Sequence, residues 1–126
     1  MVSVSHERHP DIERLLSDPT FAGAAADSMQ ALATPSRLRI LARLHDGPAS
    51  VGELAQAVAM EHSAVSHQLR LLRHMGLVVG RRDGRQVVYE LHDDHVAELL
   101  LQVVSHVDHV RLGFAGRERD AREALA

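Results

Sequence analysis

Apolar residues recur every three or four positions through most of the chain, which is the spacing of helices. The pattern predicts five helices: residues 20–32, 35 to a stop at 46–48, 51 to a break near 60, 63–75, and 93 or 94 to about 112. Between the last two, LVVGRRDGRQVVYEL, residues 77–91, predicts two strands around Asp83-Gly84. The pattern therefore predicts a mainly α chain with a small β-hairpin.

The helix boundaries carry residues that cap or stop helices. Thr34 before Pro35 predicts a helix start, and Ser50 with Glu53 predicts a capping box. Stops are predicted at three glycine-containing positions, which are Asp46-Gly47-Pro48, Gly76 and Gly113. A short helix, a turn, a second helix and then a hairpin is the order of a winged helix–turn–helix.

The length of 126 residues favours a single domain. We expect residues 19–112 to form it, as a winged helix–turn–helix domain that binds DNA and dimerises through its terminal helices. Residues 1–18 are polar and predict a flexible tail or a loose first helix, and residues 113–126 are charged and predict a flexible, frayed tail.

Composition removes several classes of protein. The chain has no cysteine, which excludes disulfides and thiolate metal sites, so any metal must be held by imidazole and carboxylate. Aromatic residues make up 2% of the chain, which argues against stacking on single-stranded nucleic acid. No apolar run is long enough for a membrane span and no secretion signal is visible, so we expect no membrane partner and a cytoplasmic protein.

Positive charge is concentrated in one segment. Residues 62–89 carry five arginines and one acid, a net charge of +4, while the chain as a whole carries −3. The candidate residues for DNA binding are Ser63, Ser66, His67 and Gln68 at base edges, and Arg70, Arg73, Arg81, Arg82 and Arg85, of which the last three would contact phosphates or the minor groove. The alternative is a solvated surface, but the helix–turn–helix pattern favours double-stranded DNA.

The last predicted helix groups histidines on one face. In HDDHVAELLLQVVSHVDH, residues 92–109, a helical wheel places His95, His106 and His109 within a sector of about 60°. Asp93 lies off that face, but as an N-cap its direction is not set by the wheel. An Asp-His-His-His set suits a metal, whereas the alternative is a set of surface histidines.

One helix cannot bring these four residues together. His95 and His106 are eleven residues apart, about 16 Å along the axis, whereas metal–nitrogen bonds are about 2 Å long. An antiparallel second copy would place Asp93 and His95 beside the partner's His106 and His109. This predicts two symmetric sites in a homodimer, with an interface formed by the intervening aliphatic residues Val96, Leu99, Leu100, Val103 and Val107.

The segments LATPSRLRIL, SAVSHQLRLLRHMGLV and DGRQVVYEL resemble the core of the ArsR/SmtB family of winged-helix metal-sensing repressors over residues 25–112. The pattern of Asp93, His95, His106 and His109 resembles its nickel/cobalt or zinc sensors, most of all the actinobacterial ones. The resemblance implies a homodimer that binds operator DNA when metal-free and releases it with metal. It also implies a hydrogen bond from the ring of His106 to a backbone carbonyl near His67, which would couple the two sites.

The metal itself stays open at this point. Nickel prefers six ligands and zinc four, so His6 and His9 could complete a larger site or could be idle tail residues. The remaining histidines are interpreted as surface or packing residues, with His62 a possible DNA contact: His45, His62, His74 and His92.

Two other functions compete with a metal-responsive repressor. A metal-dependent hydrolase is disfavoured because there is no HExxH motif and only Glu98 is left as a general base, so we expect no enzyme. A winged-helix regulator that responds to pH or to a small organic ligand is the main alternative.

Overall fold

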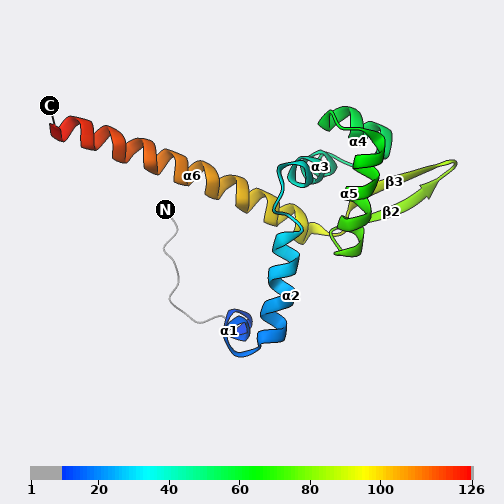
Figure 1. Cartoon of the computed structure of the whole chain (residues 1–126), viewed down its shortest axis with the longest axis horizontal. Helices are drawn as coiled ribbons and strands as arrows, with labels where there is room; N and C mark the ends of the chain where they lie inside the picture. The colour runs from blue at the N-terminus through cyan, green and yellow to red at the C-terminus, as the bar shows by residue number, and fades with distance from the viewer. Residues whose placement is uncertain (1–9, 126) are drawn as a thin grey trace.

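The computed structural model describes residues 10–125 and has six helices and three strands in that range (Figure 1). In chain order these are α1 (Pro10–Ser17), α2 (Pro19–Gln30), α3 (Pro35–His45), β1 (Ala49–Ser50), α4 (Val51–Val58), α5 (His62–His74), β2 (Val78–Asp83), β3 (Gln86–Leu91) and α6 (Asp94–Leu125). The winged helix–turn–helix order is confirmed. None of the helices in the described range is sufficiently long and apolar to span a membrane.

The predicted starts of α3 and α4 are confirmed. The Thr34 hydroxyl accepts a hydrogen bond from the Arg37 backbone N at 3.3 Å, and Pro35 is the first helical residue. At α4, the Glu53 backbone N donates to Ser50 Oγ at 3.2 Å, and the Ser50 backbone N donates to Glu53 Oε1 at 3.1 Å. Both directions of the capping box are therefore present, and free N–H groups at the helix start are satisfied locally.

Two short left-handed steps shape the helix–turn–helix. Ala59, with φ of +54°, ends α4 and turns the chain into α5. Gly76, with φ of +74°, follows α5 as predicted, and the next backbone N, that of Leu77, donates to Leu72 O at 2.9 Å. This closes the end of α5 in the manner of a Schellman motif.

The sheet has one strand more than the sequence predicted. Strands β2 and β3 pair antiparallel, and β1 adds two residues on the other side of β3, giving the order β1-β3-β2. A strand of two residues has no periodicity that a sequence could show. The hairpin loop is Gly84-Arg85, one position later than predicted, because Asp83 still pairs with Gln86 and Gly84 takes the positive φ of +64°.

The core lies where α3, α4, α5 and the sheet meet. Its fully buried residues include Ile40 and Leu41 of α3, Leu54 of α4, and Leu69 and Leu72 of α5. Helix α6 adds Val96 and Leu100, which pack against α3 and β3. Most of α6 runs away from this core (Figure 1).

Both predicted tails contain helix in the range described. Residues 10–17 of the N-terminal segment form α1. The sequence predicted that the last helix ends at Gly113, but α6 continues to Leu125. A glycine inside a helix costs only about 1 kcal/mol, and the following residues are rich in Ala, Arg and Glu, which are strong helix formers. Gly113 was therefore too weak a signal to predict a stop.

Candidate DNA-binding and metal-binding surfaces

The outward face of α5 carries most of the predicted base-reading residues. Ser63, Ser66 and His67 recur at helical spacing with Arg70 and Arg73, and all except the half-buried Ser66 are exposed. The opposite face of the helix is buried in the core. The core thus holds α5 by its apolar side and presents polar side chains to solvent, as a helix that enters a major groove requires.

Gln68 does not belong to this face. It is half-buried, and its Oε1 accepts a hydrogen bond from Arg37 Nε at 2.8 Å. Its side chain therefore joins α5 to α3, a contact that does not favour the prediction that Gln68 reads bases. A partner 31 positions away in the sequence leaves no local signal.

The wing presents three exposed arginines. Arg81 Nη1 lies 3.6 Å from Glu90 Oε1 across the hairpin, a surface ion pair of small energetic value. Arg82 and Arg85, at the tip, have no ion pair with any residue of the described range. Two guanidinium groups are thus free to meet phosphates.

Asp93 organises the start of α6. Its Oδ1 accepts from the Val96 backbone N at 3.3 Å, which confirms Asp93 as the N-cap. Its Oδ2 lies 3.5 Å from His95 Nδ1 and 3.1 Å from His92 Nδ1. One oxygen therefore caps the helix while the other faces two imidazoles. The closeness of Asp93 and His95 was predicted, but the approach of His92 was not.

The same contacts act on the charge of Asp93. The hydrogen bond from the His92 ring holds the pKa of the Asp93 carboxyl below its ordinary value. Burial opposes this lowering, and the contacts with His95 and the Val96 backbone add to it. The carboxylate is therefore ionised near neutral pH, as a metal ligand must be.

The other two predicted ligands lie elsewhere on the same helix. His106 and His109 are exposed and lie beyond Leu100, where α6 leaves the core. Because α6 is continuous from Asp94, the separation of about 16 Å between His95 and His106 stands. Among the side chains that the structure describes in one copy, no three His, Asp or Glu are arranged to hold a metal ion. The candidate ligands His6 and His9 lie outside the described residues.

The predicted coupling would join the ring of His106 to a backbone carbonyl near His67. The His67 side chain is exposed on the outer face of α5, whereas α6 packs on α3 and β3. No hydrogen bond joins α5 to α6 among the described residues of one copy, so this coupling stays a prediction.

The apolar stripe of α6 divides into two parts. Val96 and Leu100 are buried in the protomer's own core, so in one copy little of their surface remains for the predicted dimer interface. The other three predicted residues stay exposed, which are Leu99, Val103 and Val107. Two apolar residues outside the predicted stripe, Leu101 and Val104, are also exposed, at 58% and 60%. Beside them, between α3 and α6, lie two apolar grooves of about 160 and 250 Å³ that share Ala42, Leu100 and Val104.

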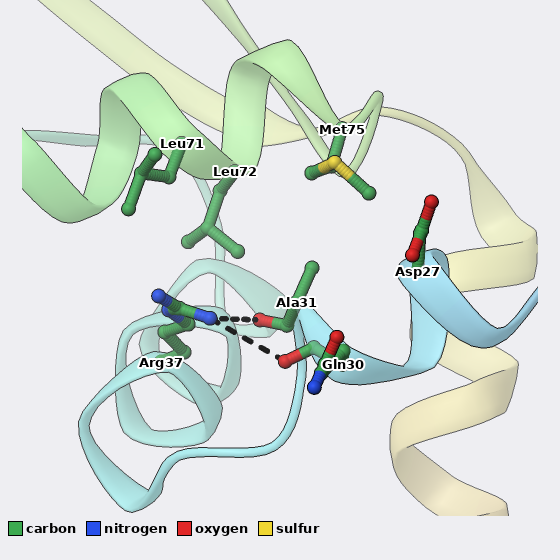
Figure 2. A pocket seen from close by; sticks show the side chains of 7 residues that line it. All are labelled: Asp27, Gln30, Ala31, Arg37, Leu71, Leu72 and Met75. Carbon is green, nitrogen blue, oxygen red and sulfur yellow. Dashed lines mark hydrogen bonds between the residues drawn. The ribbon is translucent and has the colours of Figure 1, made fainter. Parts of the chain in front are cut away.

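A cavity of about 380 Å³ lies among α2, α3 and α5 (Figure 2). Its apolar wall comes from α5, and Asp27 lies across from it. The one cation in the wall, Arg37, is already engaged: its Nη1 donates to the backbone O of Gln30 at 3.4 Å and of Ala31 at 3.5 Å. Its Nε is held by Gln68, so the guanidinium acts as a brace between helices.

Comparison with known proteins agrees with this architecture. The family model described as "Bacterial regulatory protein, arsR family" matches residues 34–79. The HTH-type transcriptional regulator NmtR of Mycobacterium tuberculosis is 54% identical over 104 residues, covering 82% of this chain and 87% of that protein.

Solved structures are similar over most of the chain. The solution structure of apo-NmtR has a TM-score of 0.64 at 49% identity and covers 86% of this chain and 87% of that one. A homodimeric winged helix–turn–helix domain from Mycobacterium bovis has a TM-score of 0.68 at 29% identity, covering 86% and 91%. With its core matched by the family model and most of its length by a close relative, the chain belongs to the arsR family of bacterial regulatory proteins.

Proposed function

We propose that this chain is a homodimeric, metal-responsive transcriptional repressor that binds operator DNA and releases it when Ni(II), Co(II) or Zn(II) binds. The observation that carries the proposal is the state of α6. Asp93 and His95 lie together at its start, while His106 and His109 lie beside an uncovered apolar face farther along. Both features are incomplete in one copy, and a second copy would complete both.

DNA binding is assigned to α5 and the wing. Ser63, Ser66 and His67 would reach base edges, and Arg70 and Arg73 would add charge on the same face. Arg81, Arg82 and Arg85 would bind phosphates, which position the protein without reading sequence. Such a repressor acts on the chromosome, in the bacterial cytoplasm, and needs no catalytic residue.

The available donors fit the proposed metals. Imidazole and carboxylate suit nickel, cobalt and zinc, and the chain has no cysteine to favour a softer ion. Asp93 and His95 of one protomer would act with His106 and His109 of the partner subunit, twice per dimer. When bound, the metal supplies ligand bonds that join the start of one α6 to the middle of the other.

This cross-link gives a physical route to release. Two reader helices must reach successive major grooves about 34 Å apart. Joining the α6 pair at both ends restricts the dimer to fewer spacings, so operator affinity falls. Because coupling between two binding sites is reciprocal, DNA must weaken metal binding by the same factor, typically worth about 1–3 kcal/mol.

The cavity of Figure 2 does not favour a small organic effector over a metal. Its guanidinium is used inside the protein, bonded to two backbone carbonyls and to Gln68. A small ligand would have to displace these hydrogen bonds before the cation could bind it.

The test is operator affinity of the full chain, measured with nickel, cobalt and zinc separately and without metal near pH 7. We expect weaker DNA binding with at least one metal. Tighter binding would make the metal a co-repressor, and no change with any of the three would remove metal sensing.

A mixed dimer tests how the site is shared. One chain lacks Asp93 and His95, and the other lacks His106 and His109. The heterodimer should bind one metal ion, because one site keeps all four residues and the other keeps none. Two ions, or none, would contradict the antiparallel pairing.

A further inference from the structure

His92 is the residue of the α6 start that the proposed function leaves unused. Its ring Nδ1 lies 3.1 Å from Asp93 Oδ2, closer than the Nδ1 of His95 at 3.5 Å from the same atom. Two imidazole nitrogens, from positions on either side of the carboxylate, thus face one oxygen. A carboxylate can only accept hydrogen bonds, so the His92 ring donates from Nδ1.

The main chain holds His92 in this place. Its backbone N donates to Leu77 O at 3.0 Å, so the residue is tied to the segment that follows α5. Asp93 is held too, because its Oδ1 is bonded to the Val96 backbone N. The side chains remain open to a partner, with His92 exposed by 49% and His95 by 89%. Both rings are therefore about half open to solvent or more, beside a main chain that is held by hydrogen bonds.

We propose that His92 is a further metal ligand, so that the start of each α6 supplies His92, Asp93 and His95 to a site completed by His106 and His109 of the partner subunit. This rests on the proposed function. Ligation requires the rings to lose the proton at the binding nitrogen, which leaves two imidazole nitrogens and a carboxylate oxygen as neighbouring donors. Because no three of these groups are spaced for a metal in one copy, the rings must turn when the site forms.

The number of donors bears on which metal is sensed. Four protein ligands satisfy zinc, which is usually tetrahedral. Five protein ligands exceed that number and leave one position of an octahedron for water, which suits nickel or cobalt. His92 would thus favour nickel and cobalt over zinc without any donor from the segment before α1.

The test compares His92→Ala, His92→Asn and a control, His62→Ala, in the full dimeric chain. Asparagine places an amide N–H near the position of His Nδ1, so it keeps the hydrogen bond to Asp93 but removes the imidazole. His62 is an exposed histidine at the start of α5, beside the wing. Affinities for nickel, cobalt and zinc are measured by competition with a chelator, and bound cobalt is followed by its visible absorption.

Both His92 variants should lose at least about 100-fold in nickel affinity, because the loss of a ligand costs no less than the loss of a hydrogen-bond partner to a ligand, which costs about 10- to 100-fold. In His92→Asn, zinc affinity should stay within a few-fold of the unmodified chain, because the four donors and the hydrogen bond to Asp93 remain. Cobalt absorption should become more intense, since four-coordinate cobalt absorbs more strongly than five- or six-coordinate cobalt. His62→Ala should change none of these values.

Three results would overturn the inference. Full nickel affinity in His92→Asn would mean that the residue only positions Asp93. Equal losses for zinc and nickel would mean that it adds no donor specific to the larger coordination number, and unchanged affinities in both variants would mean that it has no role. The proposed function fails separately, if Asp93→Ala and His106→Ala leave metal binding intact.

Discussion

The winged-helix body, residues 35–91, and helix α6 differ in how much of their apolar surface is buried within one chain. The body buries residues from three helices and two strands against one another, and no buried side-chain polar atom in the described range lacks a hydrogen-bond partner. Of the described residues of helix α6, Val96 and Leu100 are the ones buried in the core, and the rest of the apolar stripe is exposed. The body is complete in one chain, whereas α6 has the surface of half an interface.

The chemistry divides in the same way. The body's candidate groups, such as Arg82 and Ser63, are exposed and ready to meet DNA without another protein residue. On α6, His95 and His106 are separated by about 16 Å along the axis, so these metal candidates need another chain to come together. Under the proposed function, DNA binding belongs to a body that is complete in one chain. Metal sensing belongs to a helix that needs a second copy.

The largest predicted effect is on assembly. Val104→Asp, at a position 60% exposed in one copy, should lower dimer stability by about 3–5 kcal/mol, because it buries an unpaired charge at the α6 interface. That corresponds to a loss of dimer affinity of more than 100-fold. Sedimentation equilibrium of the metal-free protein measures it.

The matched control is Val87→Asp on β3, an exposed valine of the body. It should leave the dimer intact, although Val87 is the less exposed of the two at 39%. Equal effects of the two substitutions would remove the distinction between a finished body and an unfinished helix.

The next effect separates the two oxygens of Asp93. Asp93→Asn should keep the α6 cap, since asparagine caps as well as aspartate, but should lower metal affinity by about 100-fold because the charged donor is lost. Asp93→Ala should lower metal affinity as much and also loosen the first turn of α6. Metal titration together with amide hydrogen exchange at residues 94–97 distinguishes them. Exchange that is unchanged in both variants would contradict the capping role.

A smaller effect is expected from the wing. Arg82→Ala should weaken DNA binding about tenfold for all sequences and reduce the slope of affinity against salt by about one, as the loss of a phosphate contact does. Ser63→Ala should instead change which sequences are preferred. Filter binding over a range of salt concentrations measures both. Neither variant should alter metal affinity in the absence of DNA, and a loss there would show that the body is not independent of α6.

The sequence predicted the body better than α6. Thr34, Ser50 and Gly76 are local signals, and each determines a boundary through hydrogen bonds to residues within a few positions. The base-reading face of α5 follows from helical periodicity alone. The position of Gln68 does not, because it depends on Arg37 in another helix.

On α6 the wheel identified the histidine face but could not divide the apolar stripe between the protomer's own core and a partner. That division depends on where α3 and β3 lie. The approach of His92 to Asp93 arises from the bend before α6, where no periodicity holds. The end at Gly113 was mispredicted because one weak signal was set against a long run of helix-forming residues.

The smallest predicted effect lies inside the body, at the start of α4. Ser50→Ala should lower the free energy of unfolding by about 1 kcal/mol through loss of the N-cap.

Glu53 completes the capping box, and its hydrogen bonds with the backbone and side chain of Ser50 lower its pKa below the ordinary 4.5. A carboxyl group with a lowered pKa stabilises the fold at any pH above its ordinary pKa. This stabilisation is lost as the pH falls through the lowered pKa of the folded state. Glu53→Gln should therefore remove the share that Glu53 has in the loss of stability below about pH 4.5. Ser50→Ala should make that share smaller, because one partner of the carboxylate is lost. Thermal unfolding between pH 3 and 7 measures this, and a steeper acid loss in Glu53→Gln would contradict it. Because α4 belongs to the finished body, neither substitution should change the metal affinity of the dimer at pH 7.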